Sequence, residues 1–570
     1  MELSNVGWLS VATIISSPED SVVTMEFAED LDLHLAWQKT KRDFSHHMNC
    51  FVSTPYITEI LGRHEDQWLS NLRERLASDT GDELDSATYE PRTSRVIDVP
   101  KSKYHLRPAS VLYIEDLVVY SALMLLLYDD VRETISWSSE SCRFSHVLYE
   151  DVGSDNRWQK FERERWQNME DEKIRLAQEY EYVLETDVSG FYENIEIERV
   201  ISVIRQMTGK TAVAMELWDL LATWAEPRKR GVPQGYGPSD ILAEAYLDSI
   251  DRRLDNHGLE HLRFNDDFFV FCESRNAAIN TQNLLEKCFR AKRLNMKTGK
   301  TEIRDASTAL EDYEEPESIF QELRDQIEQS VDDEQSLSPH MDSPYGGAST
   351  PPASSEYGGS TEENGEEDEA TLNEDALEQA YRDHIEDSSF DDLERHLFRY
   401  IINHLGKVGS PIAVDYCQEY IREGRPDVRR IVYDYFNDLS NSETIADELA
   451  QDIVDDRLRY SYHEFVLIRW FFESGYNSPA ILHAARNALN GERILEAREF
   501  AIATLGEYGD YSDWENIEMR YNQEHRPTTK AVMAYALRNF EPRHRDSFYD
   551  RIDHSHHITR RAIEAANEDT

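Results

Sequence analysis

The chain has 570 residues, enough for roughly three to four domains and a large hydrophobic core. Hydrophobic residues make up 40% of it and aromatic residues 11%, which excludes a wholly disordered chain. The longest apolar run, Leu117 to Tyr128, is too short to span a bilayer, and the N-terminus lacks the basic segment of a secretory signal. Five cysteines without a CxxC pair argue against a disulfide framework, so we expect a cytoplasmic protein with no membrane partner.

The charge balance is extreme. The sequence has 112 Asp and Glu residues against 60 Lys and Arg residues, a net charge of −52, and only 14 of the 60 are lysines. A carboxylate-rich surface with few lysines is typical of a protein in concentrated salt, where a Debye length of about 3 Å at ~1 M screens self-repulsion. An ordinary acidic protein with one acidic tail is the alternative, but the acids are spread over most of the chain. We therefore expect a halophilic protein, in which an acidic charge argues less strongly against a nucleic-acid partner.

The first half of the chain is predicted to contain two regions. Residues 1–90 have mostly helical patterns, with a basic patch at Lys39, Lys41 and Arg42. Residues 91–305 alternate short apolar runs with helical periodicity. Such alternation predicts a mixed α/β domain.

The composition changes in the third region, residues 306–375, which is rich in acids. Its centre, 336–370, consists mainly of Ser, Pro, Gly and Glu and cannot bury enough apolar surface to order itself. We predict a disordered linker there, preceded by a last helix of the α/β domain over 319–331.

The fourth region, residues 376–570, is predicted to be helical throughout. One apolar face runs from Ala480 to Leu489 and a second from Ile494 to Leu505, the second ended by Gly506. Similar segments recur around Trp470, Leu505 and Leu537, which are 35 and 32 residues apart. A period in the thirties with two helices per unit indicates an α-solenoid of HEAT-like repeats, and an irregular helical bundle is the alternative.

A first candidate metal ligand follows a buried strand. Tyr182, Val183 and Leu184 predict the strand, and Asp187 stands at its end before a turn at Ser189-Gly190. An acid at a strand end beside a glycine turn is well placed to bind a metal ion. A turn or helix-capping aspartate is the ordinary alternative for this residue alone.

Two further acids stand at the tip of a predicted hairpin. Apolar runs around Leu262–Phe264 and Phe268–Cys272 flank Asn265, Asp266 and Asp267. Adjacent acids between aromatic strands are costly unless they are exposed or neutralised by a cation, and carboxylate oxygens are the hard ligands that Mg²⁺ requires. A plain polar turn is the alternative.

Two other segments could serve a nucleotide site. Gly231, Pro233, Gly235 and Gly237 form an irregular loop, after which Ser239-Asp240 is predicted to cap a helix. The stretch 287–300 has six bases and no acid, which in so acidic a chain favours a track for phosphates over a solvated helix face.

Taken together, these segments resemble the palm and fingers of a reverse transcriptase, over roughly residues 30 to 305. Five motifs in the family's order give a much stronger signal than any single one. The motifs are Ile97-Asp-Val-Pro-Lys101 with Arg107-Pro108, Asp187-Val-Ser-Gly-Phe-Tyr192, Arg230-Gly-Val-Pro-Gln-Gly235, Phe264-Asn-Asp-Asp267 and Asn295-Met-Lys-Thr-Gly-Lys300. The resemblance implies an α+β fold, with a right-hand polymerase palm and fingers followed by the all-α, solenoid-like C-terminal region.

The resemblance also implies an activity and a metal site. The expected activity is that of an RNA-directed DNA polymerase, a nucleotidyltransferase. Asp187 and Asp266 would bridge two Mg²⁺ ions, with Asp267 in support, for nucleotidyl transfer from dNTPs. The expected partners are dNTPs and an RNA template or DNA product.

The remaining roles implied by the resemblance concern the nucleotide. Lys101 and Arg107 would hold its triphosphate, unless they are merely solvated surface charges, and Lys300 would neutralise or protonate the leaving group. Tyr192 matches the steric gate that excludes ribonucleotides. Gln234 would position the nucleotide and template.

The sequence departs from the family pattern at three positions. Phe264 replaces the usual tyrosine, Asp240 replaces the usual proline, and Glu244 stands where asparagine is common. We expect the last two to affect the template-binding wall more than the metal site.

The region after the last motif separates the subfamilies. A reverse transcriptase followed by helical repeats resembles the abortive-infection and defence-associated class of prokaryotes, as do the segments Ala36–Asp43 and Phe191–Ile195. The class implies antiviral defence, in some members by untemplated or protein-primed DNA synthesis, and a homo-oligomer through the repeats is a further expectation. A non-catalytic nucleic-acid-binding scaffold is the rival, disfavoured because all three acids and both fingers bases are present.

Overall fold

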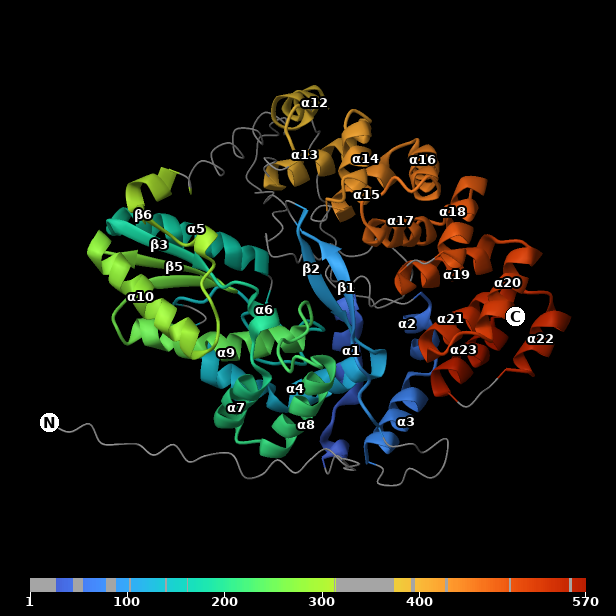
Figure 1. Ribbon diagram of the computed structural model, residues 1–570, viewed down its shortest axis with the longest axis horizontal. Helices are drawn as coiled ribbons and strands as arrows, with labels where there is room; N and C mark the ends of the chain where they lie inside the picture. Colours follow the sequence, from blue (N-terminus) through green and yellow to red (C-terminus); the bar gives the residue numbers. More distant parts are fainter. Residues whose placement is uncertain are drawn as a thin grey trace.

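The structure is a computed structural model (Figure 1). It describes residues 27–44, 55–77, 89–101, 104–138, 141–160, 162–311, 313, 374–390, 395–425, 429–491, 494–552 and 556–569. The helix predicted over 319–331 and the linker centre predicted over 336–370 lie outside the described residues.

Three helices and a two-stranded hairpin form the first part of the chain. The helices are α1 (Leu33–Phe44), α2 (Ile57–Arg63) and α3 (Glu65–Ala77), consistent with the helical pattern of residues 1–90. The antiparallel strands β1 (Arg95–Pro100) and β2 (Leu106–Val111) then form the fingers hairpin, in which Val99 lies opposite Arg107. The long helix α4 (Ile114–Ile135) follows.

The basic patch predicted in α1 is not an open surface patch. Lys39 is fully buried, and its Nζ donates to the carbonyl oxygens of Asp155 (3.1 Å) and Arg157 (2.8 Å). Burial lowers the pKa of Lys39 to about 8. Lys41 Nζ lies 3.4 Å from Glu65 Oε2. These lysines therefore hold α1 against its neighbours, because the helix is enclosed on the side where they stand.

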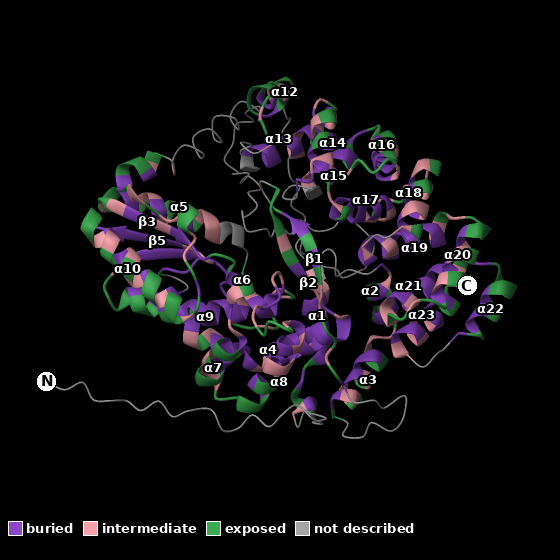
Figure 2. Cartoon of the chain, in the orientation of Figure 1, coloured by how far each residue is buried: buried purple, intermediate pink, exposed green. Residues whose placement is uncertain are grey.

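A four-stranded antiparallel sheet forms the palm. Its strands are β3 (Tyr182–Asp187), β4 (His261–Phe264), β5 (Asp267–Cys272) and β6 (Glu302–Asp305), in the order β4-β5-β3-β6. The predicted hairpin is confirmed as β4 and β5, the palm hairpin, with Phe264 opposite Asp267. Helix α10 (Arg275–Ala291) packs against β3 and β5, and the strands are buried where the helices cover them (Figure 2).

Helices between the palm strands complete the core. They are α5 (Glu162–Glu179), α6 (Phe191–Asn194), α7 (Ile197–Thr208), α8 (Thr211–Trp224) and α9 (Gly237–Asp255). Helix α4 packs against α1, α7, α8 and α9, and the apolar run from Leu117 to Tyr128 is buried along most of its length. The mixed α/β pattern predicted for residues 91–305 is thus confirmed. Among the described helices, none combines the length and the apolar character needed to cross a membrane.

The described part of the chain after residue 373 is helical, which confirms the all-α C-terminal region. Alternate helices stack on one another: α16 on α18, α17 on α19, α19 on α21 and α21 on α23, and the row curves around the first half of the chain (Figure 1). The principal helices are α12 (Glu374–Tyr381), α13 (Arg395–Val408), α14 (Val414–Arg422), α15 (Arg429–Asp438), α16 (Ser442–Val454), α17 (Ser461–Glu473), α18 (Pro479–Asn490), α19 (Leu495–Tyr508), α20 (Tyr511–Tyr521), α21 (Pro527–Ala536), α22 (Pro542–Tyr549) and α23 (His557–Glu568).

One predicted helix end is wrong. Helix α19 continues through Gly506 to Tyr508. A Cβ atom built on Gly506 would lie only 2.6 Å from the Cβ of Ala536, so the glycine allows α19 and α21 to approach closely. Helix α18, by contrast, ends at Asn490, just before Gly491. A glycine in a helical pattern can serve packing as well as termination, and the sequence pattern alone does not separate the two.

The C-terminal helices also pack against the N-terminal helices. Helix α2 lies against α21 and α23. Tyr56 Oη, just before α2, donates to Glu507 Oε1 (2.8 Å), and the Arg63 guanidinium donates to Asp569 Oδ1 (2.6 Å). Segments at opposite ends of the described chain therefore form one packed unit.

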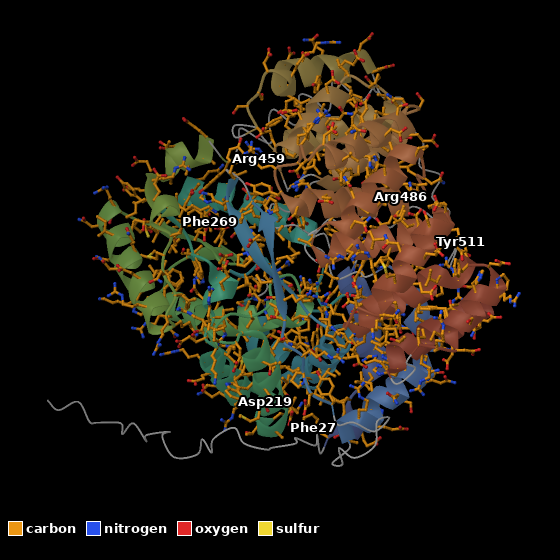
Figure 3. All side chains as sticks on the ribbon, turned by 45° about the vertical axis from the view of Figure 1, so that its right-hand side comes forward. Phe27, Asp219, Phe269, Arg459, Arg486 and Tyr511 are labelled. Carbon is orange, nitrogen blue, oxygen red and sulfur yellow. The ribbon has the colours of Figure 1, made fainter. Side chains whose placement is uncertain are left out.

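The C-terminal helices also hold the tip of the fingers hairpin. Tyr104, in the turn between β1 and β2, is 47% exposed, and its ring lies 4.5 Å from the Arg425 guanidinium and 4.9 Å from that of Arg459. Its hydroxyl donates to Glu423 Oε2 (3.3 Å) and accepts from Arg425 (3.1 Å). Figure 3 shows Arg459 where the C-terminal helices face the first half of the chain. The hairpin that carries Lys101 and Arg107 is thus tied to the C-terminal region.

Candidate active site

Three carboxylates from two strands meet at one end of the palm sheet. Asp187 is the last residue of β3 and Asp267 the first of β5, and the two lie directly opposite in the register. Asp266 stands in the turn beside Asn265, whose φ of 54° is a left-handed conformation that asparagine tolerates. The Asp266 carbonyl accepts a hydrogen bond from the Val188 amide (3.2 Å). The structure therefore brings together the three acids predicted from the sequence.

Burial and mutual repulsion oppose the ionisation of this cluster. Burial raises the pKa of Asp266 to about 8, and the negative charges of Asp267 and Asp187 act in the same direction. Burial raises the pKa of Asp267 to about 7, although the nearby Lys300 acts against the shift. A neighbouring cation would offset these costs and allow Asp266 and Asp267 to ionise.

Two lysines already bind one of the acids. Lys300 Nζ lies 2.8 Å from Asp187 Oδ2, and Lys297 Nζ lies 3.2 Å from the same oxygen. The backbone fixes this arrangement, because the Lys297 amide donates to the Asp187 carbonyl (2.8 Å) and the Ser189 amide donates to the Asn295 carbonyl (2.8 Å). Lys300 was a predicted site residue, whereas Lys297 was missed. Its only sequence signal was its place in the same Lys-Thr-Gly-Lys motif.

The fingers cations approach the same acids. Burial lowers the pKa of Lys101, and the positive charges of Arg107, Lys297 and Lys300 lower it further, while Asp187 raises it. Lys101 follows β1 and Arg107 lies in β2, so the hairpin register sets them on facing strands. Lys101 thus lies within electrostatic reach of Asp187 and of the other three cations, Arg107, Lys297 and Lys300, and a group of cations beside carboxylates suits a triphosphate.

Tyr192 lies beside the acids but is held by a residue of another helix. It belongs to α6, is 8% exposed, and its hydroxyl donates to Asp240 Oδ1 at 2.7 Å. Its backbone carbonyl accepts a hydrogen bond from the Val232 amide (3.0 Å). This bond ties the motif Asp187–Tyr192 to the irregular loop 231–237, the Gly-rich loop. Gly231 in that loop has a φ of 96°, and a Cβ there would meet the Glu193 carbonyl oxygen at 3.2 Å.

The Gly-rich loop differs from the prediction at its end. Helix α9 begins at Gly237, with Pro238 in its first turn, so Ser239 and Asp240 lie inside the helix and do not cap it. Ser239 is buried and its hydroxyl bonds Tyr120 Oη (2.9 Å). Gln234 is half-buried in the turn before the helix, and within the described residues it has no hydrogen bond or ion pair to the other predicted site residues.

A buried ionic network supports the palm hairpin from below. Arg263 in β4 is fully buried; its guanidinium donates to Asp251 Oδ2 (2.7 Å), Glu244 Oε2 (2.8 Å) and the carbonyl oxygen of Asn265 (2.8 Å). Burial alone would raise the pKa of Asp251. The charge of Arg263 and the neighbouring His261 outweigh burial and lower this pKa to about 2. Arg263 thereby links α9 directly to the turn that carries Asp266.

This network corrects one expectation and adds residues that sequence reasoning missed. Glu244 was expected at the template-binding wall, but it is 2% exposed and accepts hydrogen bonds from Arg263 and from the Ser145 hydroxyl (2.9 Å). A buried carboxylate needs such partners, so its place in the core follows from the arginine. Neither Arg263 nor Asp251 belongs to a recognisable sequence motif. Their ion pair joins a helix to a strand, so no local pattern predicts it.

The donor set suits a hard divalent cation, although it does not form a closed metal cage. Across the described ranges, no group of three or more Asp, Glu, His or Cys side chains is arranged to hold a metal ion. Mg²⁺ ordinarily takes only one or two protein carboxylates and completes its coordination with water and substrate phosphates. Two acidic side chains with raised pKa beside Asp187 fit that requirement. The residues present therefore fit Mg²⁺ bound together with a nucleotide.

Comparison with known proteins gives a family for the central part of the chain. Residues 99–319 match the family model described as reverse transcriptase (RNA-dependent DNA polymerase). No curated protein sequence matches the chain. Among solved structures, the telomerase of Candida albicans in complex with the TWJ fragment of telomeric RNA is similar, at 12% sequence identity and a TM-score of 0.30. That similarity covers 72% of this chain and 70% of the telomerase chain.

Proposed function

Since residues 99–319 are a reverse transcriptase domain and the enzyme is a nucleotidyltransferase of the RNA-directed DNA polymerase type, we propose that Asp187, Asp266 and Asp267 are its catalytic acids. We propose further that dNTPs are its substrates. The observation that carries the proposal is that acids at the ends of β3 and β5 lie near cations of the fingers hairpin and of the motif Asn295–Lys300. Carboxylates for metal and cations for phosphate within one site are the requirements of phosphoryl transfer.

The proposed chemistry needs two Mg²⁺ ions. When bound, they would activate the primer hydroxyl and stabilise the departing pyrophosphate. Asp187 and Asp266 would hold them, with Asp267 in support. Because both side chains must lose a proton to act as ligands, the raised pKa of Asp266 and Asp267 implies that metal binding would release protons.

The cations would serve the triphosphate. Lys101 and Arg107 would bind its phosphates, and Lys300 would neutralise or protonate the leaving group. In the structure, Lys300 and Lys297 instead form ion pairs with Asp187. We infer that nucleotide binding transfers these two ammonium groups from the carboxylate to the phosphates, so that the acid becomes free to bind metal. Gln234 would position the nucleotide and template from the loop.

The preference for deoxyribonucleotides is assigned to Tyr192. Its ring is buried beside the acid cluster, and the charges of Asp240 and Asp266 both act on its hydroxyl. A ring fixed there would occupy the space that a 2′-hydroxyl needs.

The test uses the full-length protein in concentrated KCl with Mg²⁺. Each labelled dNTP or NTP is supplied with a primed RNA template, with a primed DNA template, and without nucleic acid. Template-dependent incorporation of dNTPs on RNA supports the proposal. Incorporation without template, or product that protease digestion releases from the protein, supports the alternative of untemplated or protein-primed synthesis. Incorporation of NTPs only would contradict the dNTP assignment.

We also propose a role in antiviral defence through a HEAT-like C-terminal region. The support is the order of a reverse transcriptase domain followed by helices that stack alternately, as in a solenoid. Because α2 packs against α21 and α23, removal of the C-terminal helices would expose a core surface, and a point variant is the cleaner test. Host cells carrying Asp266→Asn should lose protection from virus. Full protection by that variant would favour the alternative of a non-catalytic nucleic-acid-binding scaffold.

A further inference from the structure

The hydroxyl of the proposed gate tyrosine donates a hydrogen bond to a well-defined acceptor. Tyr192 Oη donates to Asp240 Oδ1 at 2.7 Å, and the two residues stand on different helices, α6 and α9. Burial, together with the negative charge of Asp240, raises the pKa of Tyr192 well above its usual value. The hydroxyl therefore keeps its proton and remains a donor at every working pH.

Asp240 stands on a rigid support. Its backbone amide donates to the Tyr236 carbonyl (3.1 Å) in the first turn of α9, and the neighbouring Ser239 is bonded to Tyr120 of α4 (2.9 Å). The Asp240 side chain is only 15% exposed, with its other oxygen 4.0 Å from His146 Nδ1. A short hydrogen bond to such an acceptor fixes the position of the tyrosine hydroxyl, and so limits swinging of the whole side chain.

The other contacts of the ring do not fix it in the same way. The Phe191 ring packs edge-to-face with Tyr192, at a centroid distance of 5.4 Å, which limits tilting but offers no hydrogen bond. A proline at position 240, the residue that the family pattern favours there, would offer no side-chain acceptor. The direction in which the Tyr192 side chain extends therefore depends on a residue in which the sequence departs from that pattern.

We propose that Asp240 is a specificity-determining residue, which holds the Tyr192 ring in the position that excludes ribonucleotides. The inference rests on the proposed role of Tyr192 as the gate. Asp240 acts through Tyr192 and is a positioning residue. It does not touch the reacting atoms.

The test is a double-mutant cycle in the full-length protein. Tyr192→Phe removes the donor and keeps the ring, Asp240→Ala removes the acceptor, and the double variant removes both. The measured quantity is the ratio of kcat/KM for a dNTP to kcat/KM for the matching NTP. We expect each single variant to lower this ratio about tenfold, which is about 1.4 kcal/mol, and the double variant to lower it no further. Asp240→Asn is the matched control; its amide oxygen still accepts a hydrogen bond, so the ratio should stay near that of the wild type.

Each other outcome overturns the inference in a distinguishable way. A wild-type ratio in Asp240→Ala, together with lost discrimination in Tyr192→Ala, would leave the gate in place and remove the role of Asp240. Unchanged discrimination in Tyr192→Ala would remove the gate and with it the inference. A hundredfold loss in the double variant would show that Asp240 acts independently of the Tyr192 hydroxyl. If Asp240→Ala does not fold, Tyr192→Phe decides, because an unchanged ratio in that variant contradicts the proposal.

Discussion

Two hairpins bring the candidate site together, and they are anchored in opposite ways. The palm hairpin, with Asp266 and Asp267, is supported by the fully buried guanidinium of Arg263. The fingers hairpin is held at Tyr104, a half-exposed ring in the turn between Lys101 and Arg107, by the exposed Arg459 and by Arg425, which is itself 6% exposed. Breaking a buried ion pair leaves an uncompensated charge in the core, whereas exposed contacts contribute roughly 1 kcal/mol or less each. The acids proposed to bind metal are thus held rigidly, and the cations proposed to bind phosphate are held by contacts that can yield.

The largest expected effect comes from the acids of the palm hairpin. Asp266→Asn should reduce nucleotide incorporation to background, because a neutral amide is a poor ligand for Mg²⁺. The variant should melt at or above the wild-type temperature without Mg²⁺, since burial and neighbouring acids already oppose the charge of Asp266. Addition of Mg²⁺ and dNTP should raise the Tm of the wild type only. The matched control is Asp98→Asn, an exposed acid of the fingers hairpin. Residual polymerisation in Asp266→Asn would contradict the metal assignment.

The next largest effect is expected from Arg263, the buried arginine that supports the same hairpin. Arg263→Met leaves Asp251 and Glu244 buried without their arginine, which should lower the free energy of unfolding by about 3–5 kcal/mol. Denaturant titration measures this loss. Arg290→Met removes an arginine that pairs with Glu286 on the surface of α10, and its effect should stay below about 1 kcal/mol. Equal effects of the two variants would show that the buried network does not anchor the palm hairpin.

We expect the KCl concentration to have a smaller and graded effect on the Tm of the whole protein. With a net charge of −52, self-repulsion is poorly screened at about 0.1 M KCl, where the Debye length is about 10 Å. We expect the Tm to rise continuously as KCl increases toward about 2 M, by differential scanning fluorimetry. Exposed ion pairs such as Arg459–Glu423 weaken under the same conditions, so a falling Tm would mean that they outweigh the repulsion. A Tm independent of KCl would contradict the halophilic interpretation.

The smallest effect is expected at the fingers hairpin. Tyr104→Ala removes the ring between Arg425 and Arg459, and loss of about 0.5–1 kcal/mol of positioning energy should raise the KM for dNTPs roughly two- to fivefold. The kcat and the Tm should change little. Tyr104→Phe keeps the ring and should retain most of the affinity. An unchanged KM in Tyr104→Ala would show that the C-terminal region does not position the nucleotide-binding cations.

The strand-end and turn positions of the three acids could be predicted because each depends on the neighbouring sequence. Asp187 follows an apolar strand, and Asp266 and Asp267 lie between two strands that pair with each other. The convergence of Lys101 and Lys300 followed from resemblance to a family, since no periodicity connects residues so far apart in the chain.

The errors arose where a distant contact overrides a local signal. Gly506 is the kind of residue that ends a helix, but contact with Ala536 places it inside one. Glu244 was expected at the template-binding wall, but its hydrogen bond with the buried Arg263 holds it in the core. Asp240 resembles a helix cap, but the helix begins earlier and its carboxylate binds Tyr192. In each case the decisive partner lies on another element and leaves no pattern in the neighbouring sequence.

The packing of α2 against α21 and α23 has a consequence for how the enzyme is made in the cell. Arg63 reaches Asp569, which lies 506 positions later in the chain. The N-terminal helices leave the ribosome long before their partners are synthesised, and such distant contacts are slow to form. The packed unit of α2 with α21 and α23 would then be completed only after translation has passed the C-terminal helices.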